Sequence, residues 1–169
     1  MTKLALLLLA VSSVFLIFIP FVTSDITQKE IDFANAIITD SRQQRTVLKP
    51  NQLLTQYAKW KCSDMANRHY FAHITPDKIG PNVGVKSLGY TLPNDYDKSQ
   101  TANNIESLGK DYQSIPEIIE AFWKSKDHRE HVFGQTNFFR QQNEYGVAVY
   151  VAPTEIFYCL EIARRNNVP

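Results

Sequence analysis

The sequence predicts an α+β domain in which helices cover an antiparallel sheet. Amphipathic helical patterns follow residue 27, a loop-rich stretch and a further helix come next, and two β-rich segments lie near the end. Helices that precede a strand pair are typical of α+β folds, whereas regular alternation of strands and helices would indicate α/β. The chain has 169 residues, 44% of them hydrophobic, which is enough for one domain with a sizeable core.

Residues 1–24 differ in composition from the rest. Lys3 precedes an almost wholly apolar run over residues 4–22, a pattern typical of an export signal that is cleaved after Ser24. The run is longer than the roughly 7–15 residues of most signal cores and matches the roughly 17–25 of a membrane span, so an uncleaved anchor is the alternative. Both interpretations place residues 25–169, a single domain, outside the cytoplasm.

The charge balance argues against nucleic acid as a partner. Lys and Arg number 18 and Asp and Glu 17, and residues 1–24 contain one Lys and no acid, so the remainder is neutral. It also lacks a long basic stripe, which nucleic-acid binding would require. We expect contact with a membrane only through the N-terminal segment, if that segment is uncleaved.

Two capping patterns mark helix starts. Thr27 and Glu30 have the spacing of a capping box, and apolar residues at helical intervals extend the predicted helix to about residue 42. Ser114 and Glu117 repeat the spacing with a proline between them, which predicts a helix to about residue 125.

A third helical pattern leads to a histidine. Apolar and small residues recur three or four apart from Leu54 to His69, which predicts a helix that ends near residue 70. His73 is the next position on this stripe, so we expect it on the buried side of the helix. A histidine at a helix exit can point its ring into a cleft, where it can bind a metal ion or move a proton.

The remaining segments are predicted as loop and strand. Residues 74–113 contain many prolines and glycines, with one short strand expected within residues 85–92. Residues 144–151 and 156–163 are β-rich and are separated by turn-forming residues, so they predict a hairpin.

Two cysteines, Cys62 and Cys159, leave two interpretations open. An exported protein meets an oxidising compartment, in which they can form a disulfide. Cys62 also falls on the apolar stripe of its predicted helix, so two buried free thiols fit equally well.

Several short segments of this chain resemble sequence motifs of the CAP superfamily. They are residues 64–66, 70–73 and 75–77 around His73, residues 123–132 around His128, residues 145–149 in the predicted hairpin, and Asn35 in the first helix. The superfamily comprises the cysteine-rich secretory proteins, antigen 5 and the plant pathogenesis-related proteins, and the match is best to its bacterial, SCP-like extracellular branch. The resemblance implies a three-layer α/β/α sandwich around a central, mostly antiparallel sheet.

The resemblance also implies a central cleft lined by two histidines and commonly by two acidic residues. The histidines carry over as His73 and His128, and in the family such histidines can bind zinc. The acidic position falls on Asn103, which is neutral and cannot act as a base. Glu106 could replace the acid if the backbone there is helical, because it would then share a face with Asn103. The second acid has no counterpart that can be placed.

Two further histidines are assigned other roles. His131 stands where the family usually has Asn, and we expect it in a surface or turn position rather than as a third metal ligand. His69 is expected to pack or to cap its helix. Two histidines alone would hold a divalent metal such as zinc only weakly, with water completing the coordination.

These observations favour a binding module over an enzyme. The leading hypothesis is an exported or envelope CAP domain whose cleft binds a small-molecule, lipid, glycan or peptide ligand, with a weakly held metal. One alternative is a hydrolase of peptide or cell-wall material that uses Glu106 as its acid. Another is a structural envelope domain with a vestigial cleft.

Overall fold

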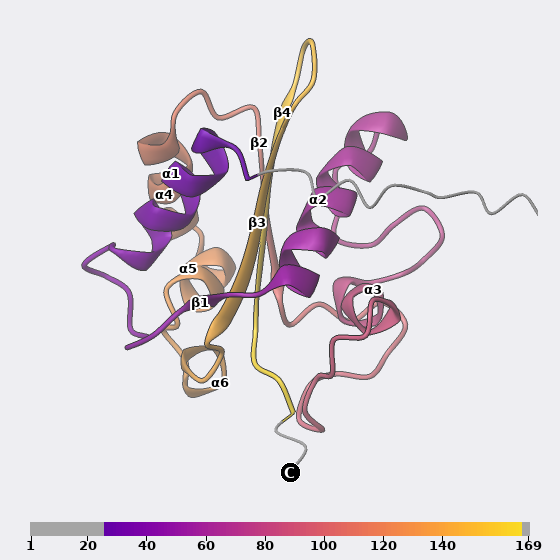
Figure 1. The fold of residues 1–169 in the computed structure, drawn as a ribbon, viewed down its shortest axis with the longest axis vertical. Helices are drawn as coiled ribbons and strands as arrows, with labels where there is room; N and C mark the ends of the chain where they lie inside the picture. The colour runs from indigo at the N-terminus through magenta and orange to yellow at the C-terminus, as the bar shows by residue number, and fades with distance from the viewer. Residues whose placement is uncertain (1–25, 167–169) are drawn as a thin grey trace, which may run out of the picture.

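The structure, a computed structural model, describes residues 26–166 and shows three layers (Figure 1). A four-stranded sheet lies between two groups of helices, as the CAP resemblance implies. The predicted export signal or anchor, residues 1–24, lies outside the described residues. Across the described part of the chain, no helix is long and apolar enough to cross a membrane.

One helical layer packs on the sheet from the side of the first helix. It contains α1 (Gln28–Ile38), α4 (Ile115–Lys124), α5 (Lys126–Val132) and α6 (Asn137–Arg140). The capping box at Thr27 is formed, but α1 ends four residues before the predicted residue 42. The Asp40 carboxylate accepts hydrogen bonds from both the main chain and the side chain of Arg42, which stabilises a turn in place of a further helical turn.

The opposite layer contains α2 (Gln52–Asn67) and α3 (Pro81–Ser87). Asn51 caps α2, and the helix stops at Asn67 because His69 adopts a left-handed conformation with φ 54°. His73 lies in the loop beyond the helix, and the expectation that it faces the buried side of α2 is wrong, because its side chain is 39% exposed. The helix α3 replaces the short strand expected within residues 85–92, because Pro81 in its first turn favours a helix start.

The sheet has the order β1-β3-β4-β2. Its strands are β1 (Lys49–Pro50), β2 (Glu106–Lys110), β3 (Glu144–Val151) and β4 (Ile156–Ala163). The predicted hairpin is confirmed, as β3 and β4 pair in antiparallel register along their whole length. The strand β2 pairs antiparallel with β4, and β1 runs parallel to β3, so the sheet is mostly antiparallel. The strand β2 lies inside the segment predicted as loop.

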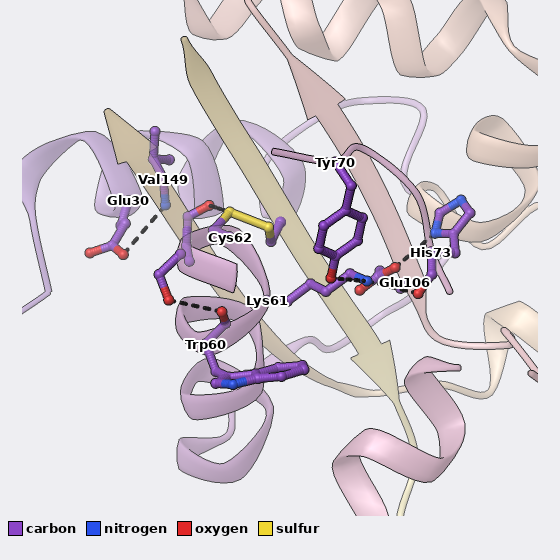
Figure 2. Close-up of a disulfide and its surroundings, with 11 residues drawn as sticks. Glu30, Trp60, Lys61, Cys62, Tyr70, His73, Glu106 and Val149 are labelled. Carbon is purple, nitrogen blue, oxygen red and sulfur yellow. Dashed lines mark hydrogen bonds and ion pairs between the residues drawn. A yellow bond between two sulfur atoms is a disulfide. The ribbon is translucent and has the colours of Figure 1, made fainter. Parts of the chain in front are cut away.

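The two faces of the sheet bury separate cores. On the α1 side, Phe33 and Phe122 pack against Val147, and on the α2 side Met65 packs with Ala148, because neighbouring strand residues point to opposite faces. A disulfide between Cys62 of α2 and Cys159 of β4 ties the second layer to the sheet (Figure 2).

Candidate functional cleft

A cavity of about 450 Å³ lies where the loop after α2, the start of β2 and the helix α5 meet. Four residues predicted for the cleft, His73, Asn103, Glu106 and His128, line it. The lining also includes Asn104, Ile105, Ser107, Ser125, Asp127, Glu130, His131 and Phe139. The fold thus brings the two histidines of the resemblance, 55 positions apart in the sequence, to one cavity.

The ring of His73 contacts a buried carboxylate. Nδ1 of His73 lies 2.8 Å from Oε1 of Glu106, whose side chain is fully buried, whereas the His73 side chain is 39% exposed. The Glu106 carboxylate can only accept, so Nδ1 carries the proton of this hydrogen bond. The Nε2 atom of His73 is then left as an acceptor or a metal ligand.

Glu106 reaches His73 from the strand β2, not from a helix at residues 103–106 as expected. Asn103 sets this geometry: its Oδ1 accepts the main-chain N–H of Glu106 at 2.9 Å and that of Ile105 at 3.2 Å. Its Nδ2 donates to the carbonyl oxygen of Glu106 at 3.1 Å. Asn103 therefore shapes the turn that leads into β2 and aims the Glu106 side chain, a role that does not require an acid.

The main chain at His73 is held by a buried lysine. Lys61 of α2 donates from Nζ to the His73 carbonyl oxygen at 2.8 Å and to the Tyr70 hydroxyl at 3.4 Å, as Figure 2 shows. Burial lowers the pKa of Lys61, while the charges of Glu106 and Glu161 act in the opposite direction. The main chain of the His73 loop is therefore bonded to α2, and the ring of His73 is bonded to β2.

His128 faces the same cavity from α5. It lies four residues past the end of α4, within the short helix α5 that begins at Lys126. Its Nδ1 lies 3.0 Å from the Ser125 hydroxyl, and its ring packs at a tilt against Phe122, with the ring centroids 4.9 Å apart. Burial first, and then the charge of His73, lower the pKa of His128, so its imidazole is neutral at neutral pH, the form that binds metals and accepts hydrogen bonds.

His131 is buried, and the expected surface or turn role is wrong. Only 4% of the residue is exposed, because the short helix α5 turns it toward the sheet. Nε2 must donate to the Ile162 carbonyl, 3.5 Å away, so the Ser107 hydroxyl donates to Nδ1 at 2.7 Å. Burial lowers the pKa of His131 to about 3, which makes it a poor base for activating Ser107. This serine–histidine pair is best explained as a structural contact of the cavity wall.

Sequence reasoning missed a second acid, Glu161. It lies directly opposite Glu106 in the β2–β4 register and is fully buried. Burial, followed by the charge of Glu106, raises the pKa of Glu161 well above its usual range. A glutamate within the apolar run of β4 was the available sign, because a charged residue in a buried strand requires a compensating partner.

The donor set fits a weak metal site at best. Among residues 26–166, no group of three or more His, Cys, Asp or Glu side chains is arranged to hold a metal ion. His73, with Nδ1 bonded to Glu106, and the neutral His128 can supply two imidazole ligands, and the carboxylate–histidine contact is of the kind that orients zinc ligands. Water would have to complete the coordination shell.

Comparisons with known proteins agree with this architecture. An outer surface protein from Borrelia burgdorferi superposes with a TM-score of 0.64 at 13% identity, over 84% of this chain and 97% of that protein. An extracellular protein with an SCP domain from Bacillus anthracis superposes with a TM-score of 0.56 at 18% identity, over 81% of this chain and 40% of that protein. The chain has the CAP fold. The fold inferred from the sequence motifs is thereby confirmed.

Sequence comparison adds a more limited result for this chain. The uncharacterized protein YkwD of Bacillus subtilis is 29% identical over 98 residues, which is 56% of this chain. The matched part amounts to 35% of the length of YkwD. No protein-family profile matches the chain.

Proposed function

We propose that this chain is an exported CAP domain whose cleft binds a ligand through His73 and His128. The observation that carries the proposal is that both histidines line one cavity of about 450 Å³ while Glu106 orients the ring of His73. A cavity with a few convergent polar groups is the usual form of a small-molecule site. Export is supported by the names of the structural relatives, one an outer surface protein and the other extracellular.

The residues that line the cavity fit a ligand that carries a polar group next to an apolar group. The Asn103 amide and the two imidazoles supply donors and acceptors, while Phe139 and Ile105 supply apolar surface. A peptide, a glycan or the headgroup of a lipid meets this requirement. A divalent metal bound between the two histidines would polarise a carbonyl or phosphoryl oxygen of such a ligand.

A calorimetric titration of the full chain with zinc tests the histidine site. We expect weak binding near one equivalent that is lost in both His73→Ala and His128→Ala. His69→Asn is the matched control, because His69 is exposed, lies outside the cavity, and Asn tolerates its left-handed backbone. Binding that survives both alanine substitutions would contradict the proposal, and absence of metal and ligand binding would favour a structural envelope domain.

The hydrolase alternative gains one specific observation. Asn103, at the acidic position of the family, is neutral. Glu106 lies 2.8 Å from His73 and supplies an acidic partner in its place. A carboxylate-bound imidazole can accept a proton from water through its other nitrogen. Incubation with peptidoglycan and with peptides, beside the Glu106→Gln variant, tests this alternative. Turnover that is unchanged in Glu106→Gln would eliminate it in this form.

A further inference from the structure

Three charged residues form a buried cluster behind His73. They are Lys61 from α2, Glu106 from β2 and Glu161 from β4, with exposed fractions of 0%, 4% and 0%. Only Glu106 lines the cavity, so the proposed function uses neither Lys61 nor Glu161. A burial of charge this complete requires an explanation, because unpaired charges are costly inside proteins.

Three of the four carboxyl oxygens in the cluster lack hydrogen-bond partners when both acids are ionised. Oε2 of Glu106 and both oxygens of Glu161 have no hydrogen-bond donor within reach. Moreover, the two residues face each other directly across antiparallel strands, where like charges are destabilising. A single proton removes both problems, since a protonated Glu161 can donate to Oε2 of Glu106.

The charges of the cluster also balance with one proton. Lys61 carries one positive charge and Glu106 one negative charge, so a neutral Glu161 leaves the cluster neutral. Two ionised carboxylates would leave a net negative charge in the interior. Tyr57 of α2, a titratable group near both acids, stays neutral and adds no charge, because burial and the two glutamates raise its pKa.

We propose that Glu161 is a positioning residue for His73: it keeps a proton at neutral pH and donates it to Oε2 of Glu106, so that the Glu106 carboxylate accepts the Nδ1–H of His73. The order of contacts is Glu161, Glu106, His73 and then the ligand. The raised pKa of Glu161 agrees with this assignment. The result is a single tautomer of His73, with the Nε2 lone pair directed to the cleft. The inference rests on the proposed function, since it concerns how that cleft presents His73.

Infrared difference spectroscopy of the full chain at pH 7 tests the proton directly. We expect the C=O stretch of one protonated carboxylic acid in the unchanged protein and its loss in Glu161→Gln. Glu120→Gln is the control, because the Glu120 side chain is 54% exposed and should leave the band in place. Absence of the band from the unchanged protein, or its persistence in Glu161→Gln, would overturn the proposal.

The positioning role is tested by the ring nitrogens of His73 in ¹⁵N NMR spectra. Glu161→Gln should keep the proton on Nδ1, because the glutamine amide still donates to Glu106. Glu161→Met should give a mixture of tautomers and bind zinc about tenfold more weakly. A tautomer that is unchanged in a folded Glu161→Met would overturn the proposal, and if that variant does not fold, the infrared band and the Glu161→Gln spectrum decide.

The same measurements separate this inference from the proposed function. A band that is lost in Glu161→Gln, in a protein that binds neither zinc nor ligand, would support the inference on Glu161 while the proposed function fails. Zinc binding through His73 and His128 without any such band would support the proposed function while the inference fails.

Discussion

The Nζ atom of Lys61 lies 2.8 Å from the main-chain carbonyl oxygen of His73. This hydrogen bond joins a buried lysine of α2 to the loop that presents the histidine ring, 12 positions further along the chain. Because Lys61 is fully buried, its charge is balanced inside the protein, where Glu106 lies near it. Lys61 therefore supports the cleft in two ways, as a donor to the loop and as a countercharge.

Lys61→Met should lower the free energy of unfolding by about 3 kcal/mol, because it leaves the Glu106 charge without compensation in the interior. It should also weaken zinc binding, since the His73 loop loses its main-chain contact. Urea unfolding measures the first effect and calorimetry the second. Lys86→Met serves as the control, because Lys86 is exposed on α3 and should change stability by less than about 0.5 kcal/mol. Equal stability of the two variants would show that Lys61 carries no such role.

Asn103 provides a second prediction, which concerns the turn into β2. Asn103→Ala removes three hydrogen bonds to the main chain and should cost about 1–3 kcal/mol of stability. Asn103→Asp keeps the two acceptor contacts and loses only the donor to the Glu106 carbonyl, so we expect it to cost about 1 kcal/mol or less.

Thermal unfolding of both Asn103 variants is the measurement. If Asn103→Asp destabilises as much as Asn103→Ala, the acceptor contacts are not what holds the turn. Restoring the acid usual in the family would then disrupt the start of β2 rather than add a cleft carboxylate.

Sequence reasoning succeeded where the information is local. The capping patterns at Thr27 and Ser114 predicted helix starts because each cap side chain accepts a main-chain N–H three positions later. The β3–β4 hairpin was predicted because strand-forming residues flank a short turn, and its register follows from that turn.

Sequence reasoning failed where the local structure depends on a partner that is distant in the chain. The strand β2 contains Gly109 and follows a loop-rich segment, and it forms because it pairs with β4 about 50 positions later. Likewise, the Glu106–His73 contact, the burial of His131 and the position of Glu161 all depend on packing between layers. The resemblance supplied the cleft histidines, but the acid next to His73 required the strand that was missed.

The disulfide between Cys62 and Cys159 supports a third prediction. The bond closes a loop with a sequence separation of 97, so the chain-entropy model assigns it about 4–5 kcal/mol of stability. Urea unfolding with and without a thiol reductant should show a loss of this size. The Cys62→Ala/Cys159→Ala double variant should have the lower stability and should not respond to the reductant. A reductant effect well below about 2 kcal/mol would mean that the denatured state keeps the two segments together.

A last prediction concerns acid stability and His131. In the unfolded chain a histidine takes up a proton below about pH 6.5, whereas the folded His131, with its pKa lowered to about 3 by burial, stays neutral. Between these two values the unfolded state binds more protons, so the stability contributed by the neutral buried ring is lost as the pH falls. From pH 7 to pH 5 the loss from this residue should be about 2 kcal/mol.

Replacing His131 by Asn, the residue usual in the family at this position, should remove this acid sensitivity. Asn is uncharged and can still accept from Ser107, so the cavity wall keeps that contact. Urea unfolding at pH 7 and pH 5 of both proteins isolates the effect, because contributions from Glu161 and His128 are common to both and cancel in the comparison. The unchanged protein should lose about 2 kcal/mol more than His131→Asn between the two pH values. Equal losses would mean that folded His131 accepts a proton near pH 6.5, and the buried neutral tautomer would then be the wrong description of this wall of the cleft.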